Sequence, residues 1–389
     1  MFSNRIAADL RPNRLAQALE TRRRAGQPVI DLTESNPTRA ALEYPRDLLA
    51  PLANAGGLLY APQPFGLIGA RRAVAAEYGR RGIAVDAARV VLTTSTSEAY
   101  SLLFKLLASP GDEVIVPRPS YPLFEPLTAL DGLVARPYDL EYHGMWSIDF
   151  ASVERSVGPR TRALLVVSPN NPTGSFISRD ELDRLAAICA PLGIALIADE
   201  VFADYELEAG AAASAACPLA RRDVLVFGLG GVSKSIGLPQ VKLGWIAVAG
   251  PERIVSEALE RLELVCDTYL SVSTPVQLAA AELLDRGGAI RRQIAARLAA
   301  NHGGLKALSV AAPSCRVLRA SGGWSAVVQV PTLRSEEELV LDLLTRDGVL
   351  VHPGYFYDFP GESYLIVSLL TPEGPFATGV GRMLERAGD

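Results

Sequence analysis

The sequence predicts an α/β fold in which a large domain, built on a mostly parallel and doubly wound sheet, is followed by a smaller α+β domain. Short apolar runs alternate with helical patterns through the middle of the chain. The later runs, from 163–167 to 245–248, are continuous rather than alternating, which is typical of parallel strands buried on both faces. After residue 250 the pattern changes to long Ala-, Leu- and Arg-rich helices and a few strands.

The order of these patterns gives the expected elements. In the large domain, helices are expected at 97–108 and 121–131 and strands at 89–92, 113–116, 134–138, 163–167, 194–198, 224–227 and 245–248. The C-terminal part carries helical patterns over 251–311 and strands at 324–330, 349–351 and 364–368. An N-terminal helix at 14–25 and an apolar run at 29–32 are expected to cross onto the smaller domain. We therefore predict a large domain over 41–274 and a small domain formed by 1–40 and 275–389.

Composition and charge exclude several classes of protein. With 49% hydrophobic and 21% charged residues and a net charge of −5, the chain has no basic stripe for nucleic acid. The cysteines form no Cys-x-x-Cys pair and the three histidines are scattered, so neither a disulfide framework nor a metal site is expected. Arg5 and Asp9 stand where a signal peptide needs an apolar core, and no apolar run is long enough for a membrane span. A cytoplasmic location is expected.

Two strand ends carry groups that bind anions or fix an amide, and ligands of open α/β sheets lie at such carboxyl ends. Ser95, Thr96 and Ser97 follow the first strand at the start of a helix, whose free N–H groups make an anion site. A plain helix N-cap would use the same residues. Asn171 follows the strand at 163–167 in a turn fixed by two prolines and a glycine. Such a turn holds the amide rigidly, or is only a rigid turn.

The next two strand ends carry an acid and an amine. Asp199 follows an unbroken apolar run, where a carboxylate is costly to bury unless it meets a cation, the alternative being a helix N-cap. Lys234 lies among small residues between two apolar runs, and an exposed loop lysine is its plain alternative. Desolvation lowers the pKa of a lysine and makes it an amine nucleophile for carbonyls. Together, the four strand ends fit a phosphorylated cofactor with an aldehyde and a basic ring nitrogen.

Longer motifs identify the family that this sequence resembles. The most specific are Asn-Pro-Thr-Gly at 171–174 and Ser-Lys at 233–234, supported by matches at 60–66, 94–99, 119–122, 198–201 and 237–239. The chain resembles, over nearly its whole length, the class I/II aminotransferases, which are aspartate aminotransferase-like enzymes of fold type I that depend on pyridoxal 5′-phosphate (PLP). The resemblance implies the same two-domain fold and cofactor.

The resemblance also implies roles for single residues. Lys234 would form the Schiff base with PLP and later move the proton, while Asp199 would pair with the pyridine nitrogen and keep the ring an electron sink. Asn171 would bind the phenolic oxygen, and Tyr121 would stack on the ring. Tyr60 would reach the phosphate of the neighbouring subunit's cofactor, which implies a homodimer with shared active sites. The phosphate would be held in its own subunit by Ser95, Thr96, Ser97 and Ser233.

Departures from the family pattern bear on the substrate. Phe202 stands where the family has a tyrosine hydroxyl near the cofactor, and Gly231 where a serine is common. Lys242 replaces the arginine on the phosphate, which keeps the charge but loses the bidentate fork. Ile366 falls where an arginine clamps the substrate α-carboxylate, and losing that contact costs on the order of a few kcal/mol. Either another cation must therefore bind the substrate carboxylate, or the substrate is not an ordinary α-amino acid.

We hypothesise that Arg39 supplies this cation, although a surface arginine is the commoner reading of such a residue. The other residues expected to line the substrate pocket are Ser35, Asn36, Trp324 and Tyr355. The predicted activity is a PLP-dependent aminotransferase that moves an amino group between an amino acid and a 2-oxo acid. The alternatives are another PLP-dependent amino-acid enzyme, such as a C–S lyase, decarboxylase or oxidase, and a non-catalytic PLP-binding protein.

Overall fold

The computed structural model of the chain describes residues 2–7, 9–361 and 363–388 and confirms the predicted fold class. An eight-stranded sheet forms the large part of the molecule, in the order β2-β9-β8-β7-β6-β3-β4-β5. Its strands are β2 (Val90–Thr93), β3 (Glu113–Arg118), β4 (Val134–Tyr142), β5 (Trp146–Ile148), β6 (Thr161–Val167), β7 (Ala195–Asp199), β8 (Val226–Gly231) and β9 (Gly244–Ala249). The pairs from β8 to β4 along this order are parallel.

One strand direction differs from the prediction. The run at 245–248 is a buried strand as expected, but β9 pairs antiparallel with both β8 and β2. The connection from β8 to β9 holds only the one-turn helix α8 (Val232–Ser235) and a 3₁₀ turn at Pro239–Val241. A parallel return needs a longer crossover, usually with a full helix, so this connection turns the chain back along the neighbouring edge. As a result β9 begins at the edge where the parallel strands end.

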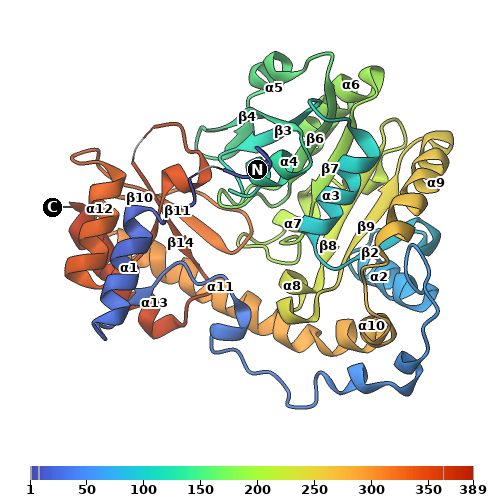
Figure 1. The fold of residues 1–389 in the computed structure, drawn as a ribbon. Helices are drawn as coiled ribbons and strands as arrows, with labels where there is room; N and C mark the ends of the chain where they lie inside the picture. Colours follow the sequence, from blue (N-terminus) through green and yellow to red (C-terminus); the bar gives the residue numbers. More distant parts are fainter. Residues whose placement is uncertain (1, 8, 362, 389) are drawn as a thin grey trace.

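Helices cover both faces of the large sheet (Figure 1). One face packs against helices that share a single apolar cluster with the strands: α3 (Thr96–Leu107), α4 (Phe124–Leu130) and α9 (Glu252–Tyr269). The other face packs against α2 (Ile68–Arg80), α5 (Phe150–Ser156), α6 (Arg179–Leu192) and α10 (Thr274–Arg286). The short helix α7 (Ala211–Ser214) belongs to the connection between β7 and β8. Burial on both faces explains why the strands read as unbroken apolar runs.

The smaller part combines an antiparallel sheet with helices from both chain ends. Its sheet has the order β10-β11-β14-β13, from β10 (Arg316–Val317), β11 (Ser325–Gln329), β14 (Tyr364–Ser368) and β13 (His352–Pro353). A two-stranded sheet joins β1 (Ile30–Asp31) to β12 (Val349–Leu350), so the N-terminal run lies on this part. Figure 1 shows the surrounding helices α1 (Arg14–Arg24), α12 (Glu336–Asp342) and α13 (Glu373–Gly388), with the long α11 (Gly288–Ser309) running between the two parts.

The domain limits at 41–274 and at 1–40 with 275–389 stay a prediction, and residues 1, 8, 362 and 389 of these ranges lie outside the described residues. Helix α10 packs on α2 of the large part, which favours a boundary near Gly287, where α10 gives way to α11. Among the described residues, we find no helix of the length and apolarity that a membrane span requires.

Candidate functional site

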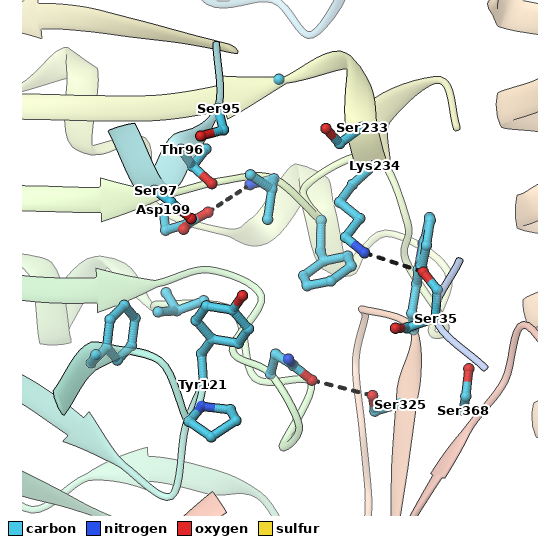
Figure 2. A pocket seen from close by; sticks show the side chains of 18 of the residues that line it. Ser35, Ser95, Thr96, Ser97, Tyr121, Asp199, Ser233, Lys234, Ser325 and Ser368 are labelled. Carbon is cyan, nitrogen blue, oxygen red and sulfur yellow. Dashed lines mark hydrogen bonds between the residues drawn. The ribbon is translucent and has the colours of Figure 1, made fainter. Parts of the chain in front are cut away.

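A cavity of about 400 Å³ opens between the large sheet and the small one, within the usual range for small-molecule sites. Its large-sheet wall is formed by the residues that end or follow β2, β3, β6, β7 and β8, together with the first residue of β9. Its opposite wall comes from β11, β13 and β14, and its rim from the segment after β1. Figure 2 shows Ser325 and Ser368 of the small sheet facing the side that carries Lys234 and Ser233.

The structure brings most of the sequence-predicted residues into this one cavity. Those that line it are Ser35, Ser95, Thr96, Ser97, Tyr121, Asn171, Asp199, Ser233, Lys234 and Trp324. The strand-end argument therefore placed four separate segments correctly at one edge of the sheet. Phe202, Gly231 and Ile366, noted as departures from the family pattern, line the cavity as well.

Five predicted residues lie outside the cavity wall. The side chains of Arg39 and Lys242 are exposed, and Tyr60 is 75% exposed and does not line the cavity. The Asn36 side chain caps the 3₁₀ turn at Pro37–Arg39 by accepting a hydrogen bond from the Thr38 amide. Tyr355 is 42% exposed. Within the described residues of one subunit, these side chains do not contact the cavity.

The start of α3 forms an anion cradle. Ser95 is the extended N-cap and its hydroxyl accepts a hydrogen bond of 3.1 Å from the Glu98 amide. In the part of the chain that the structure describes, the hydroxyls of Thr96, Ser97 and Ser233 have no protein partner. These free donors and the positive end of the helix suit a phosphate group.

Gly244 makes room for this cradle. A Cβ atom on this residue would lie 2.9 Å from the Thr93 hydroxyl oxygen and 3.0 Å from the Ser95 carbonyl carbon. The second of these neighbours is backbone and cannot rotate away. The absence of a side chain at the first position of β9 therefore allows the Ser95 turn to approach the edge of the sheet.

Lys234 extends from α8 into the cavity, where its amine donates a 3.3 Å hydrogen bond to the Ser35 carbonyl oxygen (Figure 2). The ammonium group also lies 4.8 Å from the ring centre of Trp324 and 5.7 Å from that of Phe202. Burial lowers the pKa of Lys234 to about 8, and the charges of Asp199 and Glu34 partly oppose this shift. A lowered pKa leaves more of the amine uncharged, which is the form that attacks an aldehyde.

Asp199 is the last residue of β7 and is buried, so burial raises the pKa of its carboxyl group. Two hydrogen bonds oppose the shift: one of 2.9 Å from the Tyr100 hydroxyl and one of 3.1 Å from the Val201 amide. The nearby positive charge of Lys234 acts in the same direction. A buried carboxylate held in this way is stabilised further by a cationic ring nitrogen placed against it. Sequence reasoning missed Tyr100, because it reads as one more apolar residue on the inner face of α3.

Asn171 connects the cavity to the small sheet. Its Oδ1 atom accepts a 3.2 Å hydrogen bond from the Ser325 hydroxyl, which leaves its Nδ2 group as a free donor (Figure 2). The same turn accepts hydrogen bonds at the Gly174 carbonyl from the Ser321 amide at 3.0 Å and the Gly322 amide at 2.9 Å. Sequence reasoning missed Ser325 because 154 positions separate it from Asn171.

The substrate end of the cavity lacks a guanidinium group: none of the described residues that line it is an arginine. Ile366 and Ser368 point from β14 to the cavity, together with Ser325 and with His352 of β13. The Phe202 ring packs 5.4 Å from the Trp324 ring and presents no hydroxyl. Sequence reasoning assigned neither His352 nor Ser368 to the site, because isolated polar residues in short strands carry no spacing signal.

These features fit PLP. The cradle at α3 offers unpartnered donors to a phosphate, Lys234 offers an amine of lowered pKa to an aldehyde, and Asp199 offers a buried acid to a pyridine nitrogen. The free Nδ2 group of Asn171 suits a phenolic oxygen. Tyr121 lines the same space, where its ring can cover one face of a flat heterocycle.

Comparisons with known proteins agree with this geometry. A family model described as aminotransferase class I and II matches residues 27–373. Nicotianamine aminotransferase B of Hordeum vulgare is 33% identical over 271 residues, which cover 67% of this chain and 48% of that protein, or about half its length. Alanine aminotransferase of Mycobacterium tuberculosis is 28% identical over 378 residues, covering 94% of this chain and 86% of that one. The structure of alanine aminotransferase from Pyrococcus furiosus shares the fold, with a TM-score of 0.84, 24% identity and coverage of 96% and 99%.

Proposed function

We propose, from the premise that this chain belongs to the class I and II aminotransferase family and is a PLP-dependent aminotransferase, that Lys234, Asp199 and Asn171 are its catalytic residues. The enzyme class and the cofactor predicted from the sequence are thereby confirmed, whereas the roles of single residues are our proposal. The observation that carries it is the convergence of a buried acid and an amine of lowered pKa on the cavity beside an anion cradle. PLP supplies a sink for the electrons that remain when the Cα–H bond of the substrate breaks.

The chain's own groups bind, orient and move a proton. The cradle of Thr96, Ser97 and Ser233 would hold the phosphate, and Asp199 would hold the ring nitrogen in its charged form. Lys234 Nζ would bind the aldehyde carbon and, once the substrate amine has displaced it, would carry the proton between the substrate carbon and the cofactor. The Phe202 and Trp324 rings flank this amine and restrict the access of water to it.

The substrates are an amino acid and a 2-oxo acid, and we propose that their side chains are uncharged. Apart from Lys234 and Asp199, the described residues that line the cavity carry no permanently charged side chain. A charged substrate side chain would therefore lose hydration without a matching charge. The relatives named alanine and tyrosine aminotransferases support this class by their names.

We also propose that the active enzyme is a homodimer in the cytoplasm. Leu58, Leu59 and Tyr60 form an exposed apolar segment, with exposed fractions of 92%, 70% and 75%. Such an apolar surface is typical of a protein–protein interface. A partner subunit covering it would bring Tyr60 to a site that this side chain does not reach in its own subunit. The four cysteines are free thiols, which supports a reducing compartment.

The proposal is tested by replacing the amine that binds the cofactor. We expect wild-type protein to show the visible absorption band of PLP linked to the lysine, and PLP bound to Lys234→Ala to show the spectrum of the free aldehyde, because the covalent link is absent. Amino acids with uncharged side chains should bleach the wild-type band and 2-oxo acids should restore it. A Lys234→Ala spectrum identical to that of wild type would contradict the assignment, and release of ammonia or carbon dioxide in place of reversible bleaching would contradict transamination.

A further inference from the structure

We propose that His352 binds the substrate carboxylate, in place of the arginine that position 366 lacks. This inference rests on the proposed use of the cavity for an amino acid. It names a specificity-determining residue that the sequence motifs do not reveal.

The position of His352 follows from the register of the small sheet. β13 pairs antiparallel with β14 so that His352 is the direct cross-strand partner of Ile366. Directly paired residues point to the same face and hold their Cβ atoms about 5 Å apart. The other cross-strand partner of Ile366 is Val327, which is aliphatic and 1% exposed. The imidazole is therefore the polar group that flanks the replaced side chain, and both residues line the cavity.

Neighbouring groups hold the imidazole in a defined orientation. Its Nδ1 atom lies 3.2 Å from the Tyr357 hydroxyl oxygen, and its ring centre lies 5.6 Å from that of Phe356. Burial raises the pKa of Tyr357 to about 12, so the phenol keeps its proton and can donate it to Nδ1. In that arrangement Nε2 carries the imidazole proton and becomes a donor. Within the described residues, Nε2 has no partner that would compete for a carboxylate oxygen.

Several other donors around the cavity are already engaged or out of reach. Lys234 is taken by the cofactor aldehyde in the proposed function. The Ser368 hydroxyl donates a 2.6 Å hydrogen bond to the Glu34 carbonyl oxygen, and the Ser325 hydroxyl donates to Asn171. Arg39, our hypothesis from the sequence, is exposed and lies outside the cavity wall. On the small-sheet wall, the N–H donors without a partner among the described residues are therefore His352 Nε2 and the buried indole Nε1 of Trp324, and of these two only the imidazole can take up a positive charge.

The charge of the imidazole sets the direction of a pH effect. Burial lowers the pKa of His352 below its ordinary value, and the Asp31 carboxylate on β1 opposes this shift. Tyr357 is the other titratable group in contact with the ring. His352 is therefore neutral at pH 7 and donates an uncharged hydrogen bond. Acidification protonates it, so binding of a carboxylate should strengthen as the pH falls, while binding of a plain amine should not share this gain.

The test uses two amines that lack a Cα–H bond: 2-aminoisobutyrate and tert-butylamine, in which a methyl group replaces the carboxylate. Neither can be transaminated through the normal proton step, so their binding is read from the cofactor absorbance of the holoenzyme. We expect His352→Phe to weaken 2-aminoisobutyrate binding about tenfold or more and to leave tert-butylamine binding within about twofold, since only the carboxylate loses a contact. His352→Gln, which keeps an N–H donor, should recover part of the loss.

The controls separate this role from simple damage to the site. Arg39→Ala should bind both amines as wild type does. Tyr357→Phe should weaken binding of 2-aminoisobutyrate only, because the His352 ring loses the hydrogen bond that orients it. Equal weakening of both amines by the His352 variants, or no weakening by either, would overturn the proposal. If His352→Phe does not fold, the wild-type pH profile decides: a carboxylate advantage that does not grow on acidification overturns it. Failure of the proposed function itself is distinct, because the holoenzyme band would then be missing.

Discussion

The amine of Lys234 is the reactive group of the proposed site, yet it is largely buried. Burial lowers the pKa of its amine to about 8, whereas the neighbouring carboxylates Asp199 and Glu34 raise it. Since only the uncharged amine attacks an aldehyde, the shift is a functional property of the folded chain rather than of lysine itself. The opposing charges keep the shift smaller than burial alone would produce.

A pH dependence of cofactor capture follows. The rate at which the PLP-free protein captures PLP should rise with pH and level off above about pH 8, rather than continue to rise toward pH 10.5. Glu34→Gln removes a charge that favours the protonated amine, so it should lower the pKa of Lys234 and move the midpoint to lower pH. Stopped-flow absorbance measures the rate. The matched control is Glu260→Gln, a carboxylate on α9, and an equal shift in both variants would contradict this explanation.

At the scale of elements, the site depends on how closely β9 and the start of α3 approach each other. Gly244 allows this approach, because a Cβ there would come within 3.0 Å of the Ser95 backbone. We expect Gly244→Ala to displace the Ser95 turn and to weaken PLP binding by about tenfold or more. A tenfold loss corresponds to about 1.4 kcal/mol of binding free energy. Gly69→Ala is the control, because a Cβ on that residue of α2 meets no atom within 4 Å. Titration of the PLP-free variants with cofactor measures the effect, and unchanged affinity in Gly244→Ala would show that the cradle tolerates the added methyl group.

The elements also show what a single sequence can predict. The large-sheet strands β2 and β6–β9 were predictable because each is a continuous apolar run, and Asn171, Asp199 and Lys234 were predictable because each lies in the segment that comes after such a run. The direction of β9 was not, because it depends on the length of a connection that forms no crossover helix.

Contacts between distant segments were out of reach for a different reason. Tyr100 meets Asp199 across 99 positions and Ser325 meets Asn171 across 154, so no local spacing links them. The position of His352 beside Ile366 follows only from the pairing register of β13 with β14. The resemblance to the family supplied the position of the missing arginine, but only the small sheet shows which side chain stands beside it.

At the scale of the whole molecule, Tyr60 is 75% exposed and does not line the cavity of its own subunit, so the role we propose for it at the cofactor requires a second copy. We expect the protein to sediment as a dimer of about 83 kDa, twice the chain mass of 41.5 kDa. Leu59→Asp should shift it toward the monomer, because a carboxylate would then be buried in an apolar interface. A wild-type monomer that binds PLP with full affinity would contradict the shared site.

Mixing two defective subunits tests the sharing directly. If Tyr60 serves the partner's site, a heterodimer of Lys234→Ala and Tyr60→Ala subunits contains one intact site, which combines the Lys234 of one chain with the Tyr60 of the other. Random exchange of equal amounts then restores about a quarter of the sites, because about half of the dimers are mixed and each has one intact site. If Tyr60 instead acted within its own subunit, every site would keep a defect, and transamination in the mixture would remain the average of the two parent proteins.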